Sequence, residues 1–67
     1  MEILLNNQPK DIASDSSVQQ LLNEVVGEKQ KGIAIAINDR VVPRTNWAQH
    51  TIQPKDNILI IKATQGG

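Results

Sequence analysis

Cysteine, tyrosine and phenylalanine are missing from this 67-residue sequence, and tryptophan occurs once, as Trp47. Without cysteine there is no disulfide framework, no thiolate nucleophile and no cysteine-based metal site. With one aromatic residue, the hydrophobic core has to be built from aliphatic side chains. Seven basic and seven acidic residues cancel, and a neutral chain without a basic stripe or interleaved aromatic residues is a poor candidate for nucleic-acid binding.

Long apolar runs are missing as well. No stretch is long enough to span a membrane, and Met1 and Glu2 lead directly into a strand pattern rather than into a secretory signal. We therefore expect a soluble, cytoplasmic protein that does not associate with membranes. A hydrophobic content of 39% is enough for a core, and a chain of this length forms one small domain with a thin margin of stability.

The N-terminal residues predict a β-hairpin, because apolar and polar residues alternate there. Ile3 and Leu5 share one face of a first strand at residues 2–6. Turn-forming residues at 6–9 lead into a second strand near residues 10–13. Pro9 lacks the N–H that a central strand would donate, which favours an edge strand.

An amphipathic helix is expected next. Ser16 and Gln19 have the spacing of a capping box, which predicts a helix start, and Gly27 predicts the end. A helix this short is marginal alone, so its apolar stripe is expected to lie on a sheet. The stripe consists of Val18, Leu21, Leu22 and Val25.

The rest of the chain predicts three more strands. Residues 32–38 and 58–63 are apolar on both faces, and Asn38 and Asp39 form a tight turn into a short strand at residues 41–42. A helical turn is expected around Trp47. With the long first and last strands side by side in the centre, this order predicts an α+β fold: a mixed five-stranded sheet curved around one helix, the β-grasp or ubiquitin-like fold.

The last residues predict a flexible tail, residues 64–67, on a domain of residues 1–63. Apolar alternation stops at Ala63, and two polar residues, Thr64 and Gln65, precede Gly66 and Gly67. Glycine loses the most conformational freedom when it is fixed, so a Gly-Gly end is poorly suited to docking on a core. We expect Thr64, Gln65 and Gly66 to present Gly67 to a partner.

The sheet face that points away from the helix predicts a second functional surface. One helix cannot cover both faces, so apolar residues on the other face would form a patch, and such patches commonly mark partner sites. A covering loop, or simple tolerance of exposure, would also explain them. The predicted docking residues are Leu4, Ala34, Ala36, Leu59 and Ile61.

Three other side chains invite a functional role. His50 has no serine, cysteine or carboxylate at a meaningful spacing, so we expect a surface residue rather than a catalytic one. Arg44 could meet an acidic partner, but a local salt bridge or carbonyl contact is preferred. Trp47 is expected to pack. We therefore assign no catalytic residue and no metal site.

Several segments together resemble the ThiS family, the sulfur carriers of thiamine biosynthesis. They are Ile37-Asn38, the run Val41-Val42-Pro43-Arg44 with Trp47 three residues later, the opening residues 1–6 and the terminal Gly66-Gly67. The resemblance implies that a dimeric ThiF-type enzyme uses ATP and magnesium to adenylate the Gly67 carboxylate. Sulfur from a cysteine desulfurase then gives a thiocarboxylate, which is delivered to thiazole synthase, ThiG. The carrier itself is then not an enzyme and binds no cofactor.

Two other functions share this fold and tail. The small subunit of molybdopterin synthase also carries a thiocarboxylate, but such subunits are usually longer and richer in phenylalanine. A ubiquitin-like modifier would use the same carboxylate on lysines, and the Val-Pro-Arg-x-x-Trp segment, residues 42–47, disfavours it.

Overall fold

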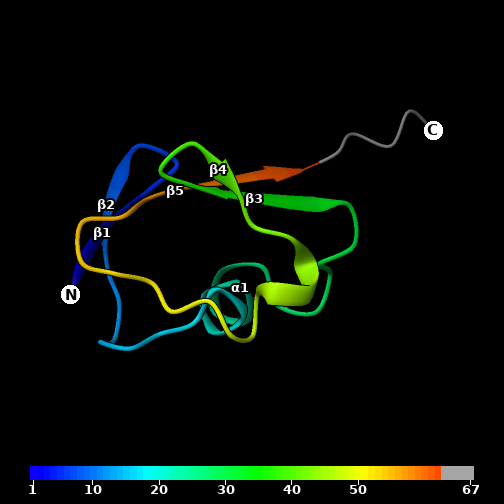
Figure 1. Ribbon diagram of the computed structural model, residues 1–67, viewed down its shortest axis with the longest axis horizontal. Helices are drawn as coiled ribbons and strands as arrows, with labels where there is room; N and C mark the ends of the chain where they lie inside the picture. Colours follow the sequence, from blue (N-terminus) through cyan, green and yellow to red (C-terminus); the bar gives the residue numbers. More distant parts are fainter. Residues whose placement is uncertain (63–67) are drawn as a thin grey trace.

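Five strands form one mixed sheet, and a single helix packs against one of its faces (Figure 1). The computed structural model describes residues 1–62. β1 and β5 are parallel, and the other strand pairs are antiparallel, in the order β2-β1-β5-β3-β4. The predicted mixed sheet, with the first and last strands side by side, is therefore confirmed. The elements are β1 Glu2–Leu5, β2 Gln8–Asp11, α1 Val18–Val25, β3 Ile33–Ile37, β4 Arg40–Val41, the 3-10 helix η1 Arg44–Asn46 and β5 Asn57–Lys62.

Both hairpins turn over two residues with left-handed backbone. Asn6 and Asn7 have φ values of 49° and 68°, and Asn38 and Asp39 have values of 50° and 70°. Two successive positive φ values give the turn whose twist matches the flanking strands, and Asn and Asp tolerate this region best among non-glycine residues. Because the first turn is so short, β2 begins at Gln8, earlier than predicted.

The helix α1 begins one residue later than predicted. The N-cap is Ser17, whose Oγ accepts the Gln20 N–H at 3.1 Å, while the Ser17 N–H donates to Gln20 Oε1 at 2.8 Å. Ser16 instead donates its Oγ hydrogen to the Ala13 carbonyl at 2.6 Å. The Ser16 carbonyl accepts the Ile52 N–H at 2.8 Å, so contact with a distant loop holds this residue outside the helix.

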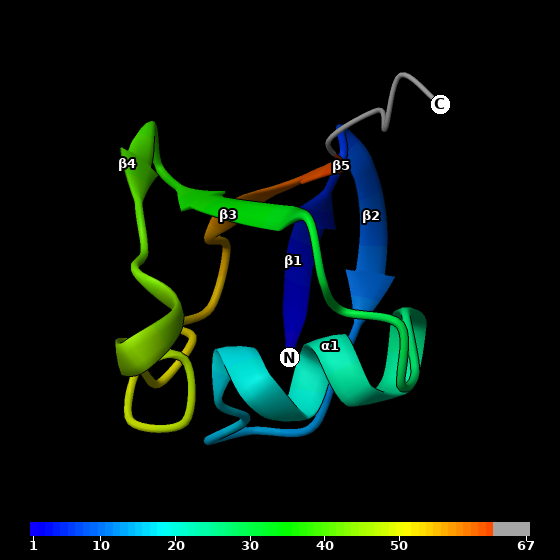
Figure 2. The same ribbon diagram turned by 90° about the vertical axis from the view of Figure 1, so that its right-hand side faces the viewer.

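The sheet and α1 form two layers, and the core lies between α1 and the inner face of the sheet (Figure 2). Ile3, Ile35 and Ile58 come from three adjacent strands and are at most 1% exposed. Alternate residues of a strand point to the same face, so these residues meet the helix together. The helix contributes the buried side chains Val18, Leu21 and Leu22.

Val25 does not belong to the buried stripe, and this part of the prediction is wrong. Its side chain is 37% exposed. It is the last residue of α1 and does not belong to the buried core cluster. Val25 lies instead beside a shallow cavity that Val26 and Ile60 also line.

Trp47 closes one end of the core, as predicted. It is 2% exposed, and its Nε1 donates to the Val42 carbonyl at 2.9 Å. The loop around it also caps the helix, because the Trp47 carbonyl accepts the Gln19 N–H and the His50 carbonyl accepts the Val18 N–H, both at 3.0 Å. The predicted helical turn is η1, which directly precedes Trp47.

Candidate functional site

The predicted tail follows β5, the middle strand of the sheet. β5 pairs with β3 from Ile58 to Lys62, but β1 pairs only with its start, at Asn57 and Ile58. The second half of β5 therefore runs beyond the β1–β2 hairpin (Figure 1). The predicted tail residues Thr64, Gln65, Gly66 and Gly67, together with Ala63, lie outside the described residues.

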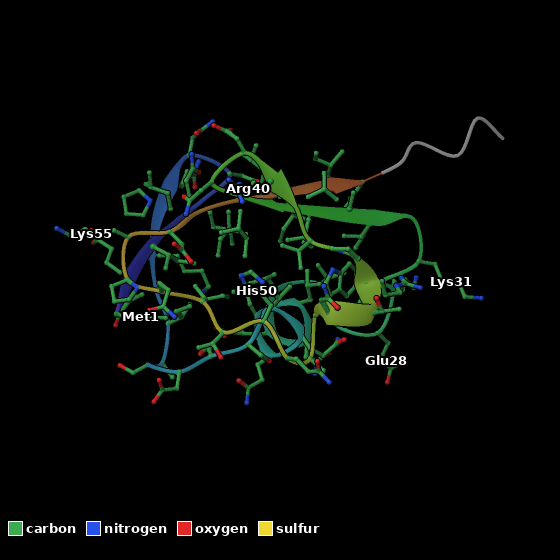
Figure 3. The ribbon with its side chains drawn as sticks, in the orientation of Figure 1. Met1, Glu28, Lys31, Arg40, His50 and Lys55 are labelled. Carbon is green, nitrogen blue, oxygen red and sulfur yellow. The ribbon has the colours of Figure 1, made fainter. Side chains whose placement is uncertain are left out.

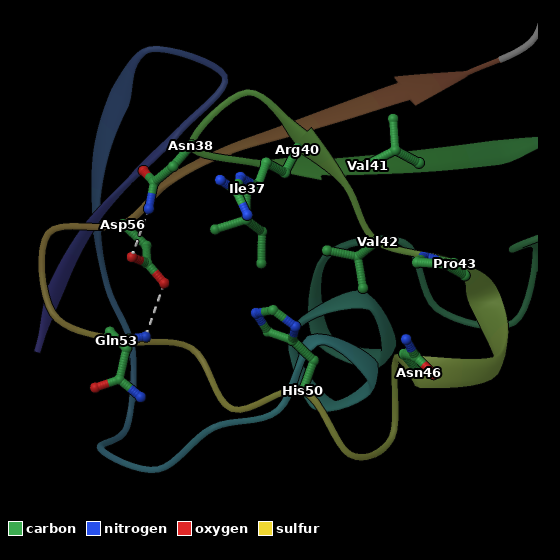
Figure 4. A pocket seen from close by; sticks show the side chains of 10 residues that line it. All are labelled: Ile37, Asn38, Arg40, Val41, Val42, Pro43, Asn46, His50, Gln53 and Asp56. Atoms are coloured by element: carbon green, nitrogen blue, oxygen red, sulfur yellow. Dashed lines mark hydrogen bonds between the residues drawn. The ribbon is translucent and has the colours of Figure 1, made fainter.

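A buried carboxylate fixes the start of β5. Asp56 is 8% exposed, and it accepts hydrogen bonds from Asn38 Nδ2 at 3.0 Å and from the Gln53 N–H at 2.8 Å (Figure 4). Asn38 Oδ1 in turn accepts the Asn57 N–H at 3.0 Å. The β3–β4 turn and the loop before β5 are thus joined by side-chain hydrogen bonds.

The outer face of the sheet carries exposed apolar side chains. Leu4 is 38% exposed and Ile61 is 53% exposed; Ala34 is exposed and Leu59 is half-buried. The strand register places Ala34 beside Ile61 on neighbouring strands. Four of the five predicted docking residues are therefore at least partly accessible.

Ala36 is the exception among the predicted docking residues. It is only 9% exposed, because it is the smallest side chain in its row and pairs with Leu59 on one side and Val41 on the other. Val41 was missed, although it is 73% exposed. A two-residue turn at Asn38 and Asp39 pairs Val41 with Ala36. The sequence therefore could have placed Val41 on the outer face. We define the outer patch as Leu4, Ala34, Val41, Leu59 and Ile61.

His50 borders an open cavity of about 450 Å³ next to Val42 and Asp56 (Figure 4). The His50 side chain is half-buried, and its backbone N–H donates to the Asn46 carbonyl at 2.8 Å. The Asp56 carboxylate is already held by Asn38 and Gln53. The geometry therefore assigns His50 a structural place between the helix and its loop.

Arg44 makes local contacts, in agreement with the preferred interpretation. Its guanidinium donates to the Gln30 carbonyl and lies 5.2 Å from the centroid of the Trp47 ring. This distance is within the range of a cation–π interaction. Arg44 thus joins the loop after α1 to the loop that caps the core.

Charged side chains are spread over the surface of the described residues 1–62. Figure 3 shows Glu28 and Lys31, from the loop between α1 and β3, and Lys55, from the loop before β5, all pointing outward. Among residues 1–62, no three histidine, aspartate or glutamate side chains are grouped as a metal site would require. Within the same residues, no helix has the length and hydrophobicity needed to cross a membrane.

Comparisons with known proteins agree with the fold and extend over the tail. A sequence model of the ThiS family matches residues 3–67. The sulfur carrier protein ThiS of Escherichia coli strain K12 is 43% identical over 67 residues, the whole of both chains. A crystal structure of the thiamine biosynthesis protein ThiS from Geobacter metallireducens superimposes with a TM-score of 0.86 at 20% identity. The match covers the whole of both chains. A solution structure of a thiamine biosynthesis protein from that organism has a TM-score of 0.80 at 22% identity, covering all of this chain and 88% of the other. These structures confirm the predicted β-grasp fold.

Proposed function

Because the chain belongs to the ThiS family of sulfur carriers in thiamine biosynthesis, we propose that it carries sulfur as a thiocarboxylate on Gly67. The observation that supports this most is the match over the full length of the E. coli carrier, including the last residues. The sequence has no cysteine, so no side-chain thiol is available to hold the sulfur. In place of a side-chain thiol, the main-chain carboxyl of Gly67 would hold the sulfur.

The first step is activation of the carboxylate. An α-carboxyl group has an ordinary pKa of about 3.3–3.7, so at neutral pH the Gly67 carboxylate is an ionised nucleophile. Its oxygen attacks the α-phosphorus of ATP in the partner enzyme, and pyrophosphate leaves. The product is an acyl adenylate, which makes the later acyl substitution easier by providing AMP as a good leaving group.

The second step replaces AMP by sulfur. The terminal sulfur of a cysteine persulfide on the desulfurase attacks the acyl carbon, AMP leaves, and an acyl disulfide forms. A thiol then attacks the other sulfur of this disulfide and releases the thiocarboxylate, supplying the two electrons of the reduction. The thiocarboxylate donates its sulfur to thiazole synthase. ATP and magnesium belong to the adenylating enzyme, and the carrier contributes its tail and a docking surface.

The two terminal glycines suit this role sterically. Glycine has no Cβ and lets the backbone approach a ligand closely. A tail ending in Gly66 and Gly67 can therefore enter a slot narrow enough to bring the carboxylate against a nucleotide.

Intact-protein mass spectrometry tests the thiocarboxylate directly. Carrier purified from cells grown without thiamine should contain a species heavier by the difference between one sulfur and one oxygen atom. Oxidation of Met1 gives nearly the same increase, so the extra mass has to be located on C-terminal fragment ions. Absence of the heavier fragment, in cells that make thiamine through this protein, would contradict the proposal.

We further propose that the outer patch docks the adenylating enzyme. Ile61→Asp places a charge on an apolar surface that the partner would have to desolvate, which is unfavourable. We expect the KM for the carrier to rise about tenfold or more in an ATP–pyrophosphate exchange assay. Ile61 is 53% exposed, so the free fold should tolerate the change.

Ala13→Asp is the matched control. Ala13 is exposed, lies in the loop between β2 and α1 and is not part of the outer patch, so the KM of this variant should stay close to that of the wild type. Equal KM values for a folded Ile61→Asp protein and this control would remove the outer patch from the docking surface.

A further inference from the structure

We propose that the open edge of β5 and the groove beside it bind an extended segment of the enzyme that adenylates Gly67. The segment would add as a strand next to Ile60 and Lys62 and place an apolar side chain in the groove. This inference rests on the proposed function, since it concerns the same partner. It assigns that partner a second contact, on the opposite side of β5 from β3 and separate from the outer patch.

The edge is open because one side chain ends the pairing of β1 with β5. The Leu4 N–H donates to the Asp56 carbonyl and the Asn6 N–H to the Ile58 carbonyl, both at 2.9 Å. The next bond of this ladder comes from the Ile60 N–H, which donates to Asn6 Oδ1 at 2.8 Å. The backbone of Asn6 has already turned into the hairpin, so its side chain replaces a strand partner at this position.

Beyond that bond, β5 has no neighbour on this side among the described strands. Antiparallel pairing alternates along a ladder, and the bond between the Asn38 N–H and the Asn57 carbonyl shows that odd-numbered residues face β3. The Ile60 carbonyl and the Lys62 N–H therefore point to the open side. Unpaired strand edges of this kind are templates for a further strand.

The groove beside this edge is apolar at its base. It has a volume of about 430 Å³ and is lined by the end of β1, the C-terminal end of α1 and the second half of β5. Val25 is 37% exposed there, and Leu5, Val26 and Ile60 are half-buried. A strand on an open edge with a pocket for one of its side chains is the arrangement by which domains bind extended peptides.

The position of the tail identifies the occupant. Residues 63–67 span at most about 17 Å when extended, so an active site that holds Gly67 lies within that distance of Lys62. The enzyme must then approach the end of the sheet where the edge and groove lie. A second copy of this chain is disfavoured, because pairing through residues 60–62 alone offers too few backbone groups for a stable strand pair, whereas the enzyme also holds the tail and the outer patch.

Backbone and side-chain variants of the full-length protein test the strand addition. Lys62→Pro removes the N–H on the open side and leaves the ladder with β3 intact, whereas Lys62→Ala removes the side chain and keeps that N–H. We expect Lys62→Pro to raise the KM for the carrier about tenfold, and several-fold more than Lys62→Ala does. Val25→Glu should also raise the KM about tenfold by charging the groove, and Ala13→Glu should not.

Hydrogen exchange of the 15N-labelled protein separates binding at the edge from a change in the tail alone. The Lys62 amide should exchange at least about tenfold more slowly when the enzyme is added without ATP. Unchanged exchange at Lys62, or protection that depends on carrier concentration without enzyme, would overturn the inference, as would a wild-type KM for folded Val25→Glu. If the wild-type carrier is not adenylated at all, the proposed function itself fails, which is a distinguishable result.

Discussion

Deletion of Gly67 should abolish growth without thiamine in a strain whose only carrier is this protein. The shortened chain still ends in a glycine carboxylate, at Gly66, so the chemistry of the nucleophile is unchanged. What changes is its reach, which falls by about 3.5 Å, the length of one extended residue. Misplacing a reacting group by about 1 Å can already cost a hundredfold in rate, so we expect no detectable adenylation.

Gln65→Ala is the matched control for this deletion. It keeps the tail length and both glycines and alters only one side chain, whereas we expect presentation of Gly67 to depend on the length of the tail backbone. We expect it to restore growth to the wild-type rate when expressed at the same level. Full complementation by the Gly67 deletion would contradict the proposed position of the carried sulfur, whereas failure of both variants would show that Gln65 contributes more than length.

Local chemistry predicted that both hairpins exist, because their turns depend on their own residues, but it placed the second strand of each hairpin one to two residues too late. Asn6 and Asn7, and likewise Asn38 and Asp39, adopt positive φ values that most other residues disfavour. The period-two pattern of the strands fixed which residues face the helix. The central position of β5 was also predictable, because its residues are apolar on both faces.

The errors arose where distant parts of the chain decide. Ser16 and Ser17 both have a glutamine at capping-box spacing, and the choice between them follows from a bond between the Ser16 carbonyl and Ile52. Val25 also has the spacing of a buried residue, but its 37% exposure depends on which distant residues pack against the end of α1. Neither of these long-range effects can be recognised in a short stretch of sequence. In contrast, Val41 could have been placed on the outer face by counting from the turn.

The strand β5 links the features of the candidate site. The Asp56 network fixes its start, and β3 pairs along it as far as Lys62. Its outer side chains Leu59 and Ile61 belong to the outer patch, while its open edge lies on the side away from β3. A partner that binds both would hold β5 from two directions, which would restrict the orientation from which the tail continues.

Trp47→Ala should remove a large share of the protein's free energy of unfolding. Removing a buried tryptophan costs about 3–5 kcal/mol, and loss of the Nε1 donor leaves the Val42 carbonyl without this partner. A domain of 67 residues has a total stability of about 3–10 kcal/mol. The loss is large here because no other aromatic side chain exists to fill the space, and because the same loop supplies the carbonyls that cap α1.

Urea unfolding followed by circular dichroism measures this effect without relying on tryptophan fluorescence. Trp47→Phe is the matched variant, since it keeps much of the packing but removes the N–H, and we expect a loss of about 1–3 kcal/mol. Val41→Ala truncates an apolar side chain that is 73% exposed and should change stability by less than about 0.5 kcal/mol. A urea midpoint for Trp47→Ala close to that of Val41→Ala would show that the end of the core closes without Trp47. The helix cap would then have to be maintained by the backbone of residues 47–50 alone.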